Sequence, residues 1–276
     1  MSRKTRLGAA AAGIAAAVVL SACSTATGGA PVAVPTASVA ASSSAETEQL
    51  IRWVDVQSEA PELDKDLEGL QYGTTPMPGI GFGYRDAEHR PEVCSLGPAV
   101  RDAAGRGGFL TAGHCTSGKA ATPAYLQGGR DTSTAPQVLL GNVEAAQDDH
   151  ATNDSAIIWA PIPPSATMIA GRWPVAGIMS AGDVPSLVRP GDPVCVNGAR
   201  SGVVCSPLIS ADGGVIRTKA VTKGNDSGSA VFVVAPSGSA ILIGIHSGVE
   251  GSAGVATFIS PALDRLRVTV ALGASQ

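Results

Sequence analysis

From about residue 79 onward, short apolar runs are separated by Gly, Pro, Asn and Asp. The clearest runs cover residues 108–111, 156–159, 230–234 and 240–244. Apolar runs of this length between turn-forming residues are typical of antiparallel strands. Glycine and proline number 34 and 19, so they supply many positions for tight turns. The pattern predicts an all-β fold, either a barrel or a sandwich.

One helix is expected close to the C-terminus, over about 261–272. Ser260 is suited to the N-cap and Pro261 to the first turn. Leu263 and Leu266 lie on one face of this predicted helix, which should end near residue 273.

The composition excludes several classes of protein. Only 15% of the 276 residues are charged and 44% are apolar, which does not fit a disordered chain or a coiled coil. The net charge is −4, and basic residues cluster only at residues 3–6. Nucleic acid is therefore not an expected partner.

The first 23 residues have the pattern of an export signal. Three basic residues precede an uncharged stretch over 7–20, which is too short for a stable membrane span. Residues 20–23 read Leu-Ser-Ala-Cys and resemble the lipobox of bacterial lipoproteins, whose Cys receives a diacylglycerol before the signal is removed. Cys23 is therefore the predicted lipidation site and membrane anchor. An ordinary secretory signal followed by a chance Cys is the alternative.

Residues 24–78 are predicted to connect this signal to the folded domain. Residues 24–45 carry no charge and are rich in Ser, Thr, Ala and Pro, as in a flexible linker. Residues 46–70 are mostly acidic and form either a short helical spacer or a cleavable pro-segment. The leucines at helical spacing are Leu63, Leu67 and Leu70. The apolar residues that could dock on a neighbouring surface are Leu50, Ile51, Trp53 and Val54.

The cysteine count fits an exported protein. The five cysteines are Cys23, Cys94, Cys115, Cys195 and Cys205. Lipidation of the first leaves four, enough for two disulfides in an oxidising compartment. No pair has the C-x-x-C spacing of many zinc sites, so no metal is expected there.

Three polar residues beside apolar runs form a candidate catalytic set. His114 follows the run at 108–111, Asp154 opens the run that continues to residue 159, and Ser227 lies in a Gly-bounded turn before the run at 230–234. Acyl transfer requires a hydroxyl nucleophile, a base that takes its proton and a carboxylate that orients the base. It also requires backbone N–H donors for the oxyanion, which tight Gly-rich turns supply.

The segments Thr-Ala-Gly-His-Cys at 111–115 and Gly-Asn-Asp-Ser-Gly at 224–228 resemble the His and Ser boxes of chymotrypsin-fold serine proteases. Cys-Ser-Leu-Gly at 94–97 and the Cys-bounded segment at 195–205 are similar to the bacterial streptogrisin and α-lytic protease branch. The resemblance covers roughly 80–272, with the three residues in the chymotrypsin order.

The resemblance implies two antiparallel six-stranded β-barrels with a C-terminal helix. The protease domain would cover 79–276, with an N-terminal barrel over about 79–165 and a C-terminal barrel over about 170–262. The active site would lie between the barrels. By the same resemblance, the disulfides would join Cys94 to Cys115 and Cys195 to Cys205.

The resemblance also assigns the catalytic roles. Ser227 would be the nucleophile, His114 the general base and then acid, and Asp154 the orienting carboxylate. The backbone N–H groups of Asn225 and Ser227 would form the oxyanion hole. Asn225 stands where the family usually has Gly, and Asn tolerates a positive φ better than other non-Gly residues.

Two further departures concern Asp226 and a missing disulfide. Val221 stands where the first Cys of a third family disulfide would be. The Ile-Val-Gly-Gly start of animal zymogen proteases is absent, so no newly cut N-terminus is expected to pair with Asp226. The bacterial branch usually places an Arg where this chain has Val196, which leaves Arg200 as a nearby candidate partner.

Four residues resemble positions of the family's primary specificity pocket, namely Thr222, His246, Ser247 and Val249. His246 occupies a place where glutamate-specific members carry a His, whereas Val249 stands where most members have Gly and would favour small substrate residues. A packed wall residue is the alternative for His246. The expected preference is Glu or a small residue, and not Lys, Arg or Phe.

These observations predict a lipid-anchored, extracytoplasmic serine endopeptidase that acts as a monomer on peptides or proteins and needs no cofactor. The membrane would be a partner only through Cys23. The sequence Asp-Asp-His at 148–150 is interpreted as a solvated turn rather than a metal site. The alternatives are an inactive binding lipoprotein of the same fold and an esterase with the same acyl-enzyme chemistry.

Overall fold

A computed structural model of the chain describes residues 52–149 and 152–274. The predicted export signal, Cys23 and the linker at 24–45 lie outside the described residues. Within the described ranges, no helix is long and apolar enough to cross a membrane.

The N-terminal sheet contains eight strands in the order β16-β3-β4-β7-β6-β5-β1-β2, antiparallel throughout. Their bounds are β1 Gly81–Arg85, β2 Pro91–Ser95, β3 Ala99–Asp102, β4 Gly107–Thr111, β5 Ala121–Gln127, β6 Gln137–Asp148, β7 Asp154–Trp159 and β16 Val268–Val270. Strand β2 lies at one edge and pairs only with β1 among the described residues. At the end of β2, the N–H of Ser95 donates to the carbonyl of Ser227. The side of β2 away from β1 therefore contacts the loop that carries Ser227.

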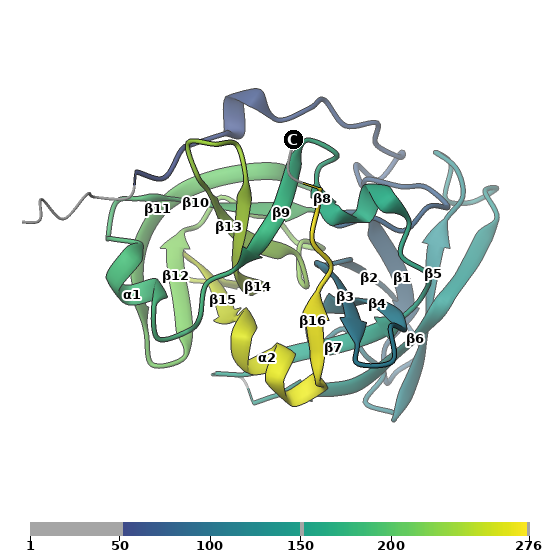
Figure 1. Ribbon diagram of the computed structural model, residues 1–276. Helices are drawn as coiled ribbons and strands as arrows, with labels where there is room; N and C mark the ends of the chain where they lie inside the picture. Colours follow the sequence, from purple (N-terminus) through teal and green to yellow (C-terminus); the bar gives the residue numbers. More distant parts are fainter. Residues whose placement is uncertain (1–51, 150–151, 275–276) are drawn as a thin grey trace, which may run out of the picture. The chain divides into compact units, whose positions relative to one another are not determined.

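The C-terminal sheet has the order β13-β10-β11-β12-β15-β14-β9-β8, and pairing of β13 with β14 closes six of these strands into a barrel. The bounds are β8 Met168–Ile169, β9 Trp173–Ile178, β10 Pro193–Gly198, β11 Gly202–Asp212, β12 Val215–Lys219, β13 Ala230–Val234, β14 Ala240–Glu250 and β15 Ala253–Phe258. Strand β9 pairs parallel to β14. The predicted all-β, chymotrypsin-like class is confirmed (Figure 1). Among the described residues, only the C-terminal sheet closes into an expected six-stranded barrel, to which β8 and β9 are added. The N-terminal sheet has eight strands with β2 and β16 at its edges, and no strand pair of the described residues closes it.

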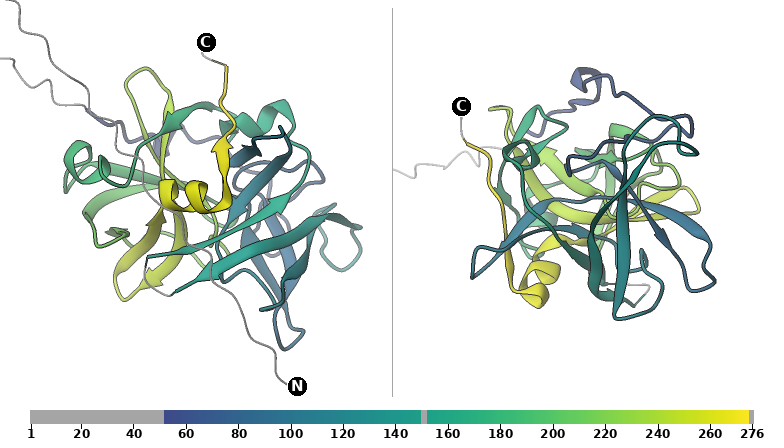
Figure 2. Two further views of the ribbon diagram at one scale, coloured as in Figure 1. Left: turned by 60° about the horizontal axis from the view of Figure 1, so that its bottom comes forward. Right: turned by 90° about the vertical axis from the view of Figure 1, so that its right-hand side faces the viewer.

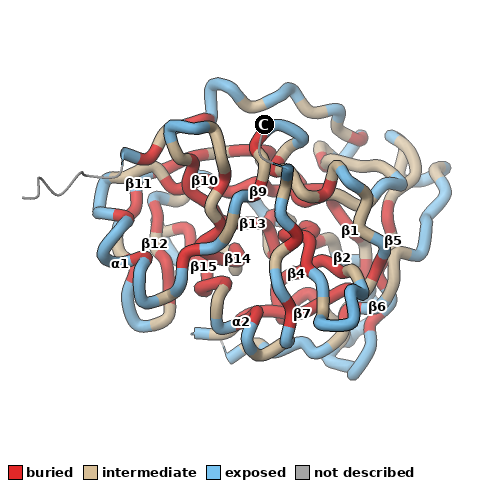
Figure 3. Tube along the Cα trace, viewed as in Figure 1, coloured by how far each residue is buried: buried red, intermediate tan, exposed pale blue. Residues whose placement is uncertain are grey.

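Buried apolar side chains explain why these runs form strands. All five residues of β13 are buried, and so are five of the six residues of β7. One core cluster contains Leu110 and Ile157 of the first sheet together with Phe232 and Leu242 of the second. The two sheets therefore share apolar packing, and the buried strands lie beneath exposed turns (Figure 3). This shared packing holds the loops that carry the candidate site in fixed relation.

The helices are short, and the C-terminal helix differs from its prediction. Their bounds are η1 Gln57–Glu59, η2 Pro164–Thr167, α1 Val184–Leu187 and α2 Ile259–Leu266. Ser260 lies inside α2, and its hydroxyl accepts the N–H of Ala181 instead of capping the helix. Arg267 adopts a left-handed conformation with φ 56°, which ends the helix. The predicted bounds of 261–272 were wrong because the next residues pair with β3 as strand β16 (Figure 2).

Residues 52–78, named the strap below, pack on the folded domain. Trp53 is only 7% exposed and donates its indole N–H to the carbonyl of Leu187. Val56 is also buried, and the side chain of Gln57 accepts the N–H of Cys205. The predicted docking of Trp53 is therefore present. Figure 1 shows the strap in purple along one side of both sheets.

The short helical spacer, one of the two alternatives for residues 46–70, does not form over the leucines of the strap. Lys65 and Gln71 form an antiparallel bridge around a turn. The Asp66 carboxylate accepts the N–H groups of Glu68 and Leu70. Such local side-chain acceptors favour a turn over a helix. Leu67 is 69% exposed while Leu70 is buried, so the leucines do not share one buried face.

Two disulfides lie at bonding distance in the structure. Cys94 and Cys115 have an S–S distance of 2.02 Å, and Cys195 and Cys205 one of 2.00 Å. The first links β2 to the residue that follows His114, and the second links β10 to β11. Both pairs are those implied by the resemblance.

Candidate active site

His114 lies in the turn directly after β4. Gly113 precedes it with no room for a side chain, because a Cβ there would meet the carbonyl of Gln147. The backbone therefore passes close to the end of β6. This approach explains the Gly and fixes the position from which the imidazole of His114 projects.

Asp154, the first residue of β7, holds His114 by two contacts. One carboxylate oxygen lies 2.8 Å from Nδ1 of the His114 ring, and the other accepts the His114 backbone N–H at 3.0 Å. The Asp154 side chain is buried, at 4% exposure for the residue. A carboxylate that accepts from both ring and backbone fixes the ring orientation and favours the proton on Nδ1.

The same pair shifts both pKa values. Burial acts to lower the pKa of His114, but the hydrogen bond and charge of Asp154, with the charge of Asp148, raise it above the usual 6.5. Burial acts to raise the pKa of Asp154, and the contacts with His114 outweigh it, so that pKa falls below 3.8. At neutral pH Asp154 is therefore ionised.

We expect kcat/KM to fall on the acid side with an apparent pKa above 6.5, because only neutral His114 accepts a proton. The stability contributed by the protonated His114–Asp154 pair is complete below the unfolded pKa and is lost as pH rises through the raised folded pKa. Measurement of kcat/KM from about pH 5 to 9 gives the pKa at which activity falls on the acid side, the acid limb. Asp148→Asn should move this limb slightly toward lower pH, because it removes one charge that raises the pKa of His114. A wild-type limb below 6.5 would contradict the assignment.

Ser227 lies in the loop between β12 and β13, at the junction of the two sheets. Its carbonyl accepts the N–H of Ser95, at 2.8 Å. Gly228 follows with φ 90°, and a Cβ there would meet the hydroxyl of Thr111. The Ser227 hydroxyl donates to the carbonyl of Ser247 at 3.3 Å. Among the described residues, it makes no hydrogen bond to His114.

Asn225 adopts the positive φ that its turn was expected to need, at 80°. Its side-chain amide donates to the carbonyl of Val93 at 3.1 Å, and its own carbonyl accepts the hydroxyl of Ser95 at 2.8 Å. Within the described residues, the backbone N–H groups of Asn225 and Ser227 donate to no acceptor. Two neighbouring donors without partners are what an oxyanion hole requires.

Asp226 is bound differently from the expectation. Its side chain is fully buried and accepts the backbone N–H of Arg200, not the guanidinium. Ser201 contributes its N–H and its hydroxyl, and Lys223 contributes its N–H. The sequence does not indicate that Ser95 and Ser201 support the Ser227 loop, because their hydrogen-bond partners lie far away in the chain and leave no local pattern.

The structure does not bring all four predicted pocket residues into one cavity. Ser247 and Val249 line a cavity of about 650 Å³ together with His114 and Asp154. His246 is only 2% exposed, and burial lowers its pKa to about 4. The hydroxyl of Thr222 is buried without a hydrogen-bond partner among the described residues. The buried Ser247 hydroxyl lies close enough to Asp154 to help lower the pKa of that carboxyl.

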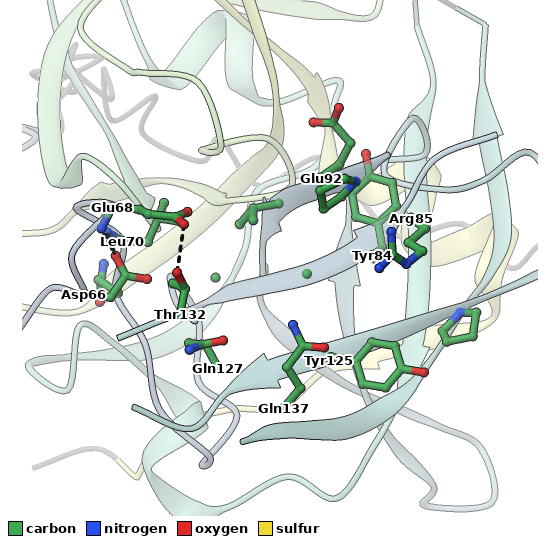
Figure 4. A pocket seen from close by; sticks show the side chains of 16 residues that line it. Asp66, Glu68, Leu70, Tyr84, Arg85, Glu92, Tyr125, Gln127, Thr132 and Gln137 are labelled. Atoms are coloured by element: carbon green, nitrogen blue, oxygen red, sulfur yellow. Dashed lines mark hydrogen bonds between the residues drawn. The ribbon is translucent and has the colours of Figure 1, made fainter. Parts of the chain in front are cut away.

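Another cavity, of about 410 Å³, lies on the N-terminal sheet and contains none of the predicted site residues (Figure 4). Asp66 and Glu68 of the strap line one side of this cavity. Tyr84 of β1 and Tyr125 of β5 also line it. Glu68 accepts the hydroxyl of Thr132 at 3.0 Å. This cavity is separate from the His114–Asp154 pair.

Two groups in the described parts of the chain could offer three ligand atoms to a metal, namely Cys94, His114 and Cys115, and His114, Asp148 and Asp154. The thiols of the first group are joined in a disulfide. In the second, a ring nitrogen of His114 is already hydrogen-bonded to Asp154. The disulfide withdraws the thiols of the first group from metal binding, and the hydrogen bond to Asp154 occupies one ring nitrogen of His114 in the second. His150, which the sequence placed beside Asp148, lies outside the described residues.

No protein-family model matches the chain, and no curated protein matches it. Among solved structures, Thermobifida fusca protease A is 25% identical, with a TM-score of 0.50 over 71% of this chain and 98% of its own. A Nocardiopsis protease is 20% identical, with a TM-score of 0.48 over 72% of this chain and 98% of its own. An α-lytic protease homologue, N4, is 21% identical, with a TM-score of 0.48 over 71% and 99%. The fold of the chain thus resembles that of a solved protease, Thermobifida fusca protease A, which agrees with the protease resemblance in the sequence.

Proposed function

We propose that the chain is a serine endopeptidase with Ser227 as nucleophile. The observation that carries the proposal is the double contact of Asp154 with His114 beside a Ser227 loop whose N–H donors are without partners. A buried carboxylate, a ring held in one tautomer and two backbone donors without partners among the described residues form the set that acyl transfer needs.

In the proposed reaction, Nε2 of His114 takes the hydroxyl proton as Ser227 Oγ attacks the carbonyl carbon of a peptide. The N–H groups of Asn225 and Ser227 bind the oxyanion, and Asp154 stabilises the imidazolium. The ring then gives the proton to the leaving amine, and an acyl-enzyme forms. Water then attacks the acyl carbon while the same ring takes a proton from it. The ring gives this proton to Ser227 Oγ as the ester bond breaks, which releases the acid and restores Ser227.

The edge of β14 supports an extended peptide as substrate. Pairing of β14 with β13 ends at Ile245, whereas pairing with β15 continues to Glu250. In the described parts of the chain, one edge of residues 247–250 therefore has no strand partner, and this edge lies beside Ser227. An extended peptide can add to such an edge through main-chain hydrogen bonds.

Reaction with a labelled fluorophosphonate tests the proposal. The activated hydroxyl should displace fluoride from phosphorus, and peptide mapping should place the label on Ser227. A wild-type protein that remains unlabelled, and that cleaves no member of a peptide library, would support the second candidate function instead. That candidate is peptide binding without catalysis, and it is favoured by the hydrogen bond from the Ser227 hydroxyl to Ser247 rather than to His114.

We further propose cleavage after Glu or a small residue. His246 is neutral near pH 7, because burial lowers its pKa to about 4. The proposal requires the substrate carboxylate to reach an N–H of this ring, which is only 2% exposed in the free protein. His246→Val should reduce kcat/KM for Glu substrates about 10- to 100-fold, the value of one hydrogen bond to a charged group. The matched Ala substrate should change little. Efficient wild-type cleavage after Arg would contradict this prediction.

Export and lipid anchoring at Cys23 are also proposed. Two disulfides in the fold are consistent with an oxidising compartment. Cys23→Ala should leave the protein soluble or unprocessed, since a diacyl anchor supplies the two chains that stable membrane attachment requires. Membrane fractionation and mass spectrometry of the N-terminus measure the change. Unchanged fractionation of the variant would refute the anchor.

A further inference from the structure

We propose that Ser201 and strap residues 63–71 position the oxyanion loop through Asp226, so that the strap is a permanent part of the enzyme rather than a removable pro-segment. The proposal rests on the proposed function, because its effect is on the same Ser227 loop. It assigns positioning roles to residues that do not touch the substrate.

Asp226 lies between the two proposed oxyanion donors, Asn225 and Ser227, so its orientation constrains both. One carboxylate oxygen accepts the N–H groups of Arg200 and Ser201 at 2.9 and 3.1 Å. The other accepts the Ser201 hydroxyl at 2.6 Å and the N–H of Lys223 at 2.8 Å. All four donors are N–H or O–H groups, and no ion pair among the described residues includes Asp226.

Burial makes these four donors necessary. Asp226 is 0% exposed, and a buried carboxylate that loses a donor carries an uncompensated desolvation cost. Three of the four donors come from the turn between β10 and β11. Gly198 enters this turn so close to Asp226 that a Cβ would meet the carboxylate. The position of the turn therefore decides the position of Asp226.

The strap holds that turn through Arg200. The Lys65 ammonium donates to the carbonyl of Arg200 at 2.6 Å. In return, the Arg200 guanidinium donates to the carbonyl of Glu68 at 3.1 Å. Both contacts join residues more than 130 positions apart in the chain. Arg200 thus links the strap by its side chain and carbonyl while its N–H binds Asp226.

Gln71 and Leu63 complete the contact. The N–H of Gln71 donates to the carbonyl of Ala199 at 2.8 Å, and its side-chain amide donates to the carbonyl of Gly198 at 2.9 Å. Gly202 has φ 70°, and a Cβ there would meet the side chain of Leu63. Each residue of the turn from 198 to 202, apart from Ser201 itself, is therefore contacted by the strap.

Ser95 gives the turn a second link to the oxyanion loop. Its hydroxyl accepts the N–H of Ala199 and donates to the carbonyl of Asn225, both at 2.8 Å. Its N–H donates to the carbonyl of Ser227. The path from strap to turn to loop is continuous in hydrogen bonds, with no requirement for a free N-terminus created by cleavage.

Ser201→Ala in the full chain tests the proposal. We expect kcat per titrated active site to fall about 10- to 100-fold with KM nearly unchanged, less than when an oxyanion donor itself is removed. A peptide aldehyde, whose adduct carries the oxyanion, should bind weaker by the same factor, while the product peptide should bind as in wild type. Ser201→Thr, which keeps the hydroxyl, should restore most of the activity.

Variants of the strap and matched controls separate positioning from folding. Lys65→Met and Gln71→Leu should likewise weaken binding of the peptide aldehyde while binding of the product peptide stays as in wild type. Glu59→Ala removes an exposed strap ion pair with Arg172, and Ser237→Ala removes an exposed hydroxyl, so both should behave as wild type. If Ser201→Ala does not fold, the two strap variants decide the result by the same measurements.

Three outcomes would overturn the proposal. They are wild-type kcat in the Ser201 and strap variants, equal weakening of aldehyde and product peptide, or the same loss in the controls. Failure of the wild-type protein to react with the fluorophosphonate would instead count against the proposed function. The two failures are therefore distinguishable.

Discussion

Ser227→Ala should lower kcat by about 10⁴-fold or more, because no other group can form the acyl-enzyme. Substrate binding should persist, since pairing with β15 holds residues 248–250 of β14 in place when the Ser227 hydroxyl is removed. Its only hydrogen bond in the described structure is a long one to the carbonyl of Ser247. Stability should therefore change by less than about 1 kcal/mol.

Active-site titration, steady-state kinetics and thermal unfolding measure these effects together. Ser237→Ala is the matched control, because it removes an exposed hydroxyl whose hydrogen-bond partner is Ser239 and not a residue of the Ser227 loop. Full activity in the Ser227→Ala protein would rule out the mechanism. Loss of activity together with loss of folding would leave the kinetic comparison to be made on the folded fraction alone.

The strand pattern and the catalytic boxes could be predicted because their signals are local. The apolar runs at 156–159 and 230–234 are buried in strands β7 and β13. Glycines near Ser227 and before His114 mark two turns. At Gly113 and Gly228 these turns pass so close to neighbouring atoms that a Cβ would not fit. These constraints act within a few residues, so they are visible in the sequence.

The strap could not be predicted in this way, because tertiary contacts override its local pattern. The spacing of its leucines favours a helix, yet Leu63 packs against Gly202 and Leu70 is buried, while Leu67 points to solvent. Its hydrogen bonds to residues 198–200 replace those of a helix. The charge of Arg200 makes it a nearby candidate partner of Asp226 in the sequence, whereas the contact in the structure uses its backbone N–H. Backbone donors carry no sequence signal.

The second large effect is expected for Asp154→Asn. The variant keeps the size of the side chain, and its amide oxygen can still accept the backbone N–H of His114. The amide NH₂ introduced by this substitution then faces Nδ1 of the His114 ring. Nδ1 must therefore accept a hydrogen bond, and the neutral ring carries its proton on Nε2. That tautomer cannot take a proton from Ser227, and a loss of kcat of about 10⁴-fold is expected.

The pH dependence distinguishes this explanation from a structural one. Without the carboxylate, the contributions that raise the pKa of His114 through Asp154 disappear, while burial continues to lower it. The ring should therefore titrate at lower pH in Asp154→Asn than in wild type, as NMR of the imidazole can measure. Asp148→Asn, which removes only a weaker charge contribution to the same ring, should retain most of kcat. Near-wild-type activity of Asp154→Asn, or an unchanged His114 titration, would show that Asp154 does not orient the base. With that, the assignment of the ring as the group that activates Ser227 would lose its structural basis.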